Sequence, residues 1–198
     1  MADTQLERSG TERAKTAGMV MVAWVALLWA LEAIDIATGH ALDPYGVTPR
    51  DLSELRDIVP SAFLHDGFGH VAANTVPLLV LGFLAALRGI RRFAGVVAMI
   101  ILAAGLGVWL TSPGDTVSLG ASGVVFGLFG YVVVRGFVDR DAVDVVVGLV
   151  IAALYGSILW GVLPTDAGIS WQAHLFGLLG GVGAAFAFRR RTCPSPAG

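Results

Sequence analysis

The 198-residue sequence contains little charge and almost no cysteine, and both shortages narrow the class of protein. Charged residues make up 14% of the chain, against about 25% in an average soluble domain. Hydrophobic residues reach 56%, and the mean hydropathy of +0.76 is typical of a membrane protein. The single cysteine, Cys193, excludes a disulfide framework. The chain also lacks a basic stripe with interleaved aromatic residues, so we expect no nucleic-acid partner.

The chain contains six apolar windows of about the length that an α-helix needs to cross a bilayer. We therefore predict an all-α membrane protein, a bundle of six transmembrane helices in a lipid bilayer. The fourth window is short, and we expect it at the centre of the bundle, where neighbouring helices cover its end. The windows are residues 17–37, 67–87, 93–111, 119–134, 143–161 and 171–188.

The sequence divides into a core and two tails. Residues 1–16 are polar and predict a disordered, cytoplasmic N-terminal tail, residues 17–190 form the six-span core, and residues 191–198 form a cytoplasmic C-terminal tail. The longest loop, residues 38–66, contains apolar residues at helical spacing that predict a short amphipathic helix. Those apolar residues are Leu52, Leu55, Ile58 and Val59.

Basic residues predict the orientation of the spans. With both termini in the cytoplasm, eleven lysine and arginine residues fall on that side, and only Arg50 and Arg56 fall outside. This bias follows the positive-inside rule and predicts a multi-pass protein of the cell membrane. A rival interpretation makes residues 17–31 a cleaved signal peptide, because Glu32 and Asp35 interrupt the window. Cleavage would leave five spans, so we favour a retained helix with these two carboxylates near the outer interface, within reach of water.

Four polar residues share one layer of the predicted bundle. Ser122 and His174 precede the arginines that end their windows by 13 and 15 residues, which places them about 20 and 22 Å from one membrane face. By the same count, Asn74 lies about 21 Å and His70 about 27 Å from that face. Polar groups at such depths are costly unless they are paired or used. The predicted orientation puts this layer nearer to the outer face.

A serine in this layer predicts nucleophilic chemistry only if a base lies beside it. For Ser122, the candidate bases within the membrane are His70 and His174. The serine lies in the Gly-Ala-Ser-Gly motif of residues 120–123, at the start of a helix whose free N–H groups can stabilise an oxyanion. The motif differs from the Gly-x-Ser-x-Gly elbow of soluble hydrolases, because Val124 occupies its last position.

Two pairs of glycines lie just below these polar residues. Gly123 and Gly127 share one face of the fourth span, and Gly177 and Gly181 share one face of the sixth. Glycines at this spacing allow transmembrane helices to approach closely. Packing of the two faces would bring the helix of the serine against the helix of the histidine.

With these elements in this order, the chain resembles the rhomboid intramembrane serine proteases over residues 17–190. The elements are His65-x4-His70-x3-Asn74, Gly120-Ala121-Ser122-Gly123 and Ala173-His174-x2-Gly177-x3-Gly181. The resemblance implies a catalytic dyad in which Ser122 is the nucleophile and His174 is the general base. It also implies an oxyanion hole formed by His70, Asn74 and the Ser122 backbone N–H.

The resemblance further implies supporting residues and a substrate. His65 would be a structural residue near the first loop, and Phe126, where some members have tyrosine, could stack on the His174 ring. The supporting glycines would be Gly120, Gly123, Gly177 and Gly181. The implied substrate is a transmembrane protein, cleaved in or near its membrane-spanning segment, and no cofactor is implied. The first loop lacks the Trp-Arg pair of many rhomboids, although Pro49-Arg50 could replace part of it.

Three other interpretations compete with the protease. His65, Asp66, His70 and His174 are conceivable ligands of a catalytic metal, but the chain has no His-Glu-x-x-His motif, and we expect no metal among them. A catalytically inactive rhomboid relative would bind membrane helices without cutting them, and the retained serine and histidine disfavour it. A transporter is disfavoured because no charged residue lies at mid-membrane depth away from the cytoplasmic helix ends.

Overall fold

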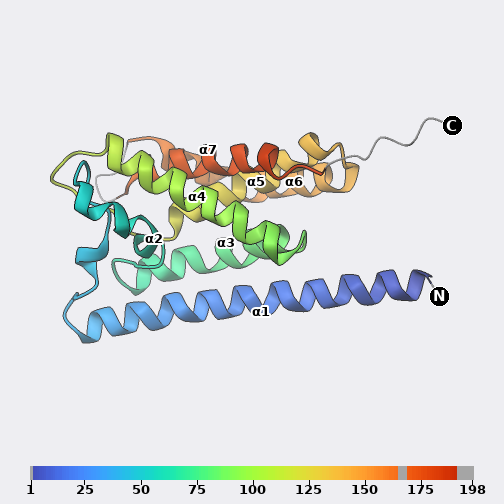
Figure 1. Ribbon diagram of the computed structural model, residues 1–198, viewed down its shortest axis with the longest axis horizontal. Helices are drawn as coiled ribbons and strands as arrows, with labels where there is room; N and C mark the ends of the chain where they lie inside the picture. Colours follow the sequence, from blue (N-terminus) through green and yellow to red (C-terminus); the bar gives the residue numbers. More distant parts are fainter. Residues whose placement is uncertain (1, 165–168, 191–198) are drawn as a thin grey trace.

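The computed structural model describes residues 2–164 and 169–190, and within them it is an all-helical bundle without strands. This confirms the predicted fold class, whereas the tail predicted for residues 191–198 lies outside the described residues. Six helices run lengthwise beside one another (Figure 1). They are α1 (Ala2–Ala37), α3 (Phe68–Ala86), α4 (Ile90–Thr111), α5 (Ser122–Asp139), α6 (Ala142–Tyr155) and α7 (Trp171–Ala187).

Most of these helices are long and apolar enough to cross a membrane. Five stretches of the described chain meet this description, and α7, with 17 residues, reaches the lower limit for a spanning helix. The five stretches are Gly10–Ala37, Phe68–Ala86, Ile90–Thr111, Ser122–Asp139 and Ala142–Val162. The last of them combines α6 with a 3-10 helix, η3 (Gly156–Val162). The chain is therefore a multi-pass membrane protein.

The N-terminal segment differs from the prediction. Residues 2–16 are helical rather than disordered, because α1 begins at Ala2 and continues without a break into the first span. The segment has no proline, and nine of its 15 residues are good helix formers (alanine, glutamate, arginine, glutamine, leucine and lysine), so the helix of the apolar span can extend through it. α1 lies along one side of the bundle against α3, and it begins at the end where α7 stops (Figure 1).

The loop between α1 and α3 contains short helices at the opposite end of the bundle, here called the Ser122 end (Figure 1). They are η1 (Asp43–Tyr45), η2 (Leu52–Asp57) and α2 (Ile58–Ser61). The predicted amphipathic helix is therefore a 3-10 helix followed by one α-helical turn. Its apolar residues do not share one face, because Ile58 is buried whereas Leu52 and Val59 are exposed. Pro60 lacks the N–H that a longer α-helix would require.

Helix α5 occupies the centre of the bundle and is buried along most of its length. It packs backbone to backbone against α7 through the two glycine pairs. A β-carbon on Gly177 would overlap the carbonyl group of Gly123, and one on Gly181 would overlap that of Gly127. The helix also continues beyond the predicted window to Asp139, before Arg140 closes it in a left-handed conformation.

The arginines that end the apolar windows do not all lie at the membrane face. Arg135 is buried, and its guanidinium group donates hydrogen bonds to the Leu84 carbonyl at 2.8 Å and to Asp144 at 3.3 Å. Arg88 also pairs with Asp144. Depths counted from such residues therefore compare one helix with another but do not measure the distance to the lipid surface.

Candidate active site

Ser122 and His174 lie in direct contact at the Ser122 end of the bundle. Ser122 is the first residue of α5, and His174 lies in the first turn of α7. The Ser122 hydroxyl is 2.9 Å from Nε2 of His174. The close approach of α5 and α7 at their glycines holds the two side chains at this distance, although 52 residues separate them in the sequence.

The second ring nitrogen of His174 determines what the first can do. Nδ1 lies 2.8 Å from the carbonyl oxygen of Gly161, in η3. A carbonyl oxygen only accepts hydrogen bonds, so Nδ1 carries the proton and Nε2 of the neutral ring is free to accept one from Ser122. The Phe126 ring stacks on the imidazole, with ring centroids 4.0 Å apart and planes 6° from parallel. The histidine is thus fixed in both tautomer and orientation.

Two further side chains from α3 face the same space. Asn74 is buried, and its amide nitrogen has no hydrogen-bond partner within the described residues. His70 lies beside Gly120, where a β-carbon would be 2.8 Å from the imidazole Cε1. Gly120 has a φ of +137°, which favours glycine, so the motif supplies both the turn and the space for His70. The N–H of Ser122 belongs to the first turn of α5, where no intrahelical acceptor exists.

His65 supports the segment that precedes the serine. Its Nε2 accepts a long hydrogen bond, 3.4 Å, from the Ala121 N–H, and its ring meets the His70 ring edge-on at 5.0 Å. Burial lowers the pKa of His65 to about 4, and the nearby His70 contributes in the same direction. The ring is therefore neutral near pH 7 and able to accept this hydrogen bond.

The four polar residues of the predicted site surround one cavity. The cavity has a volume of about 310 Å³, and its lining includes Ser122, His174, His70 and Asn74 among mainly apolar residues. A second hollow of about 1000 Å³, here called the vestibule, shares His70 with this cavity. Its lining is more polar and includes the carboxylates Asp43, Asp66 and Asp115.

Two contributions to the site could not be found in the sequence. Gly161 accepts from His174, and the Ser61 carbonyl oxygen accepts the Gly120 N–H at 2.8 Å. Both contributions come from main-chain carbonyl groups, which every residue has. No residue type or spacing therefore marks them.

Comparison with known proteins places the chain in a family. A family model described as the Rhomboid domain matches residues 52–191, which include all of the site residues named above. The chain belongs to the Rhomboid family. Rhomboid proteins are generally serine proteases, and this membership agrees with the resemblance seen in the sequence.

Proteins from two Mycobacterium species and from Bacillus subtilis are similar to this chain in sequence. The "Uncharacterized protein Rv1337" of Mycobacterium tuberculosis is 41% identical over 177 residues, which are 85% of this chain and 74% of the relative. The "Uncharacterized protein ML1171" of Mycobacterium leprae is 39% identical over 177 residues, 85% of this chain and 70% of the relative. The "Putative rhomboid protease YdcA" of Bacillus subtilis is 31% identical over 130 residues, 63% of this chain and 62% of the relative.

Proposed function

We propose that this Rhomboid protein is an intramembrane serine endopeptidase that hydrolyses a peptide bond in or near the transmembrane segment of another protein. The observation that carries this proposal is the hydrogen bond from Ser122 to Nε2 of His174. A serine hydroxyl becomes a useful nucleophile when an adjacent base can remove its proton. The adjoining cavity of about 310 Å³ offers space for a short stretch of substrate backbone.

The reaction follows from the positions of the donors and acceptors. As the Ser122 oxygen attacks the substrate carbonyl carbon, its proton passes to Nε2 of His174. The Gly161 carbonyl accepts from Nδ1 and stabilises the positive imidazolium, the role that an acidic residue has in a triad. His174 then donates the proton to the leaving amine as the peptide bond breaks. Water, activated by the same nitrogen, hydrolyses the acyl-enzyme and restores Ser122.

Charge on the substrate oxygen requires donors that are already in place. Asn74 presents an amide nitrogen without a partner in the described structure, and His70 and the Ser122 N–H border the same cavity. Such preorganised donors stabilise the tetrahedral intermediate more than they stabilise the planar carbonyl. In this proposal they form the oxyanion hole.

The proposal includes a location. The excess of basic residues on one side favours the cell membrane with both termini in the cytoplasm and Ser122 toward the outer face. Helix α1 begins at the same end of the bundle at which α7 stops, and an even number of membrane crossings requires this arrangement (Figure 1).

A covalent probe tests the proposed activity without a known substrate. A small fluorophosphonate is expected to modify Ser122 in the wild-type protein in detergent, because His174 can remove the hydroxyl proton. His174→Ala is expected to suppress the adduct although Ser122 remains. Mass spectrometry of the intact protein and of its peptides measures both results.

Ser118 provides an internal control for this labelling. It lines the same cavity, but its hydroxyl pairs weakly with that of Ser170 at 3.4 Å rather than with a base. We expect no adduct there. If correctly folded wild-type protein gives no Ser122 adduct, the chain is instead an inactive relative that binds membrane helices.

Loss of Asn74 is expected to slow turnover without ending it. Removal of one oxyanion donor typically lowers kcat by about 10²–10³, and His70 and the Ser122 N–H remain in Asn74→Ala. Cleavage of a panel of single-span proteins in proteoliposomes measures the effect. Thr75→Val is a matched control, since the Thr75 hydroxyl contacts the Val71 carbonyl and the Trp29 ring rather than the cavity. If Asn74→Ala turned over substrate as fast as the wild type, Asn74 would be a packing residue and not an oxyanion donor.

A further inference from the structure

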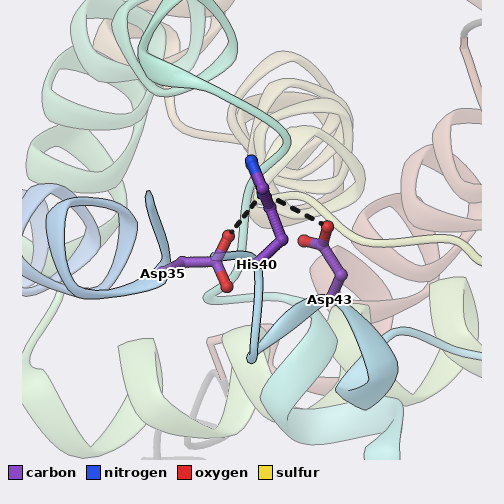
Figure 2. Close-up of side chains that lie close together, drawn as sticks. All are labelled: Asp35, His40 and Asp43. Atoms are coloured by element: carbon purple, nitrogen blue, oxygen red, sulfur yellow. Dashed lines mark hydrogen bonds and ion pairs between the residues drawn. The ribbon is translucent and has the colours of Figure 1, made fainter. Parts of the chain in front are cut away.

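A second cluster of ionisable side chains lies at the Ser122 end, where α1 passes into the first loop. Asp35 comes from the last turns of α1, and His40 and Asp43 come from the chain that follows it (Figure 2). Nδ1 of His40 lies 3.1 Å from Asp35 Oδ2 and 3.4 Å from Asp43 Oδ2. One donor atom from each of the three side chains lies within 4.8 Å of the others. Figure 2 shows the imidazole between the two carboxylates.

The local backbone holds this arrangement in place. The Leu42 N–H donates to Asp35 Oδ1 at 2.7 Å, which leaves Oδ2 of the same carboxylate to face His40. His40 has a φ of 64°, in the left-handed region. The left-handed conformation is unfavourable for residues other than glycine. At His40 it directs the imidazole ring toward the two carboxylates.

A buried carboxyl group beside the cluster lacks a counter-ion among the residues that the structure describes. Glu32 lies one turn before Asp35 on the same face of α1 and is 1% exposed. Within the described residues its side chain has no ion-pair partner and no hydrogen bond of good geometry, although the Gly67 N–H lies near it. Glu32 interacts electrostatically with Asp35, Asp43 and His40. The sequence placed Glu32 and Asp35 within reach of water, and this prediction is wrong, because both side chains are buried. A buried carboxyl group is costly to ionise, and a nearby cation would favour its ionised form.

The charge in this region is strongly unbalanced. Among the ion pairs of residues 2–164 and 169–190, Asp35 and Asp43 pair only with His40, and neither meets an arginine or lysine. The carboxylate of Asp66 lies near enough to Asp43 to add further negative charge. One histidine cannot neutralise this many acidic groups. A divalent cation would neutralise two of them at once.

We infer that Asp35, His40 and Asp43 bind a divalent transition-metal ion, with Zn²⁺ the best fit. In a tetrahedral zinc site with bonds of about 2.0–2.1 Å, neighbouring ligand atoms lie about 3.3 Å apart. The two distances from His40 match this separation, and Asp43 is exposed enough to rotate toward the ion. An imidazole nitrogen with carboxylate oxygens suits zinc, whereas Ca²⁺ and Mg²⁺ prefer shells made of oxygen alone. Water would complete the coordination, and Glu32 would add negative charge behind it.

The inferred site goes beyond the proposed protease activity and does not depend on it. A bound ion would join the end of α1 to the first loop. Asp43 also lines the vestibule that reaches His70, so the ion would lie at the edge of the space that borders the candidate active site.

Titration of the full-length, tag-free protein with Zn²⁺ in detergent tests this inference. We expect one saturable site per chain, and a thermal unfolding temperature that rises with zinc because the ion binds the folded state. His40→Asn and Asp43→Asn should each raise the Kd for zinc at least tenfold and remove the thermal shift. Asparagine is chosen at position 40 because it tolerates the left-handed conformation. Both side chains are partly exposed, which makes the variants compatible with folding.

Two controls separate this site from adventitious binding. Glu54→Gln, in the same loop but outside the cluster, should bind zinc as the wild type does, and Asp43→Glu should retain binding because it keeps a carboxylate. Absence of saturable binding, or equal affinity in the wild type and in both ligand variants, would overturn the inference. Tighter binding of Ca²⁺ than of Zn²⁺ at the same residues would overturn the choice of a transition metal.

Discussion

Ser122→Ala and His174→Ala are each expected to abolish measurable cleavage by this Rhomboid protein. Removal of the nucleophile or the base from a serine protease lowers kcat by roughly 10⁶-fold. The double variant should be no worse than either single variant, because the two groups act as one unit through their 2.9 Å hydrogen bond. Cleavage of single-span proteins in proteoliposomes measures all three variants.

Correct folding must be shown for this result to be informative. The variants should insert in the membrane and unfold at temperatures close to that of the wild type, which circular dichroism in detergent can establish. A fully active His174→Ala protein would contradict the assignment. The role of base would then move to His70, the other histidine that lines the cavity.

Gly181→Ala is expected to lower the activity about 10²-fold, although residue 181 does not line the cavity. The added methyl group would overlap the Gly127 carbonyl, so α5 and α7 would have to separate. Overpacking of this kind typically costs about 1–3 kcal/mol. Ser122 and His174 lie on these same two helices, and a displacement of about 1 Å at a reacting group can lower the rate about 10²-fold. Fluorophosphonate labelling and thermal unfolding measure the two effects.

Gly183 offers a matched control on the same helix. A β-carbon there would meet only the terminal methyl group of Met99 at 3.1 Å, and that flexible side chain can move. Gly183→Ala should therefore label and unfold nearly as the wild type does. Equal behaviour of Gly181→Ala and the wild type would show that the contact between α5 and α7 does not hold the dyad.

The fold and the grouping of the polar residues could largely be predicted from the sequence. Apolar windows mark the membrane spans because lipid requires continuous helices with apolar surfaces. Counting from the arginines placed Ser122 and His174 in one layer, and the structure brings them into contact. The count succeeded even though Arg135 is buried, because only relative depth was needed to compare α5 with α7.

The remaining features depend on contacts that a single sequence does not reveal. Residues 2–16 are polar, and polarity alone does not distinguish a tail from a helix that continues beyond the membrane. Glu32 and Asp35 are both buried, and Asp35 accepts a hydrogen bond from Leu42 in the first loop. The path of that loop cannot be predicted from its hydropathy. The acceptor for His174 is a carbonyl oxygen from η3, which has no side-chain signature.

The Gly161 carbonyl that orients His174 has a consequence for how the activity of the proposed enzyme could be regulated. In a triad the orienting group is a side chain, and a point mutation can delete it. Here the orienting group is the main chain of η3, so a substitution at position 161 keeps the carbonyl group itself. A β-carbon at that position would, however, lie 2.9 Å from Phe126 Cζ and 3.1 Å from His174 Nδ1, so a side chain there would act by displacing the segment or the rings. A shift of η3 would allow the imidazole to change tautomer and leave Ser122 without a base. The activity of the proposed enzyme would therefore depend on the position of η3.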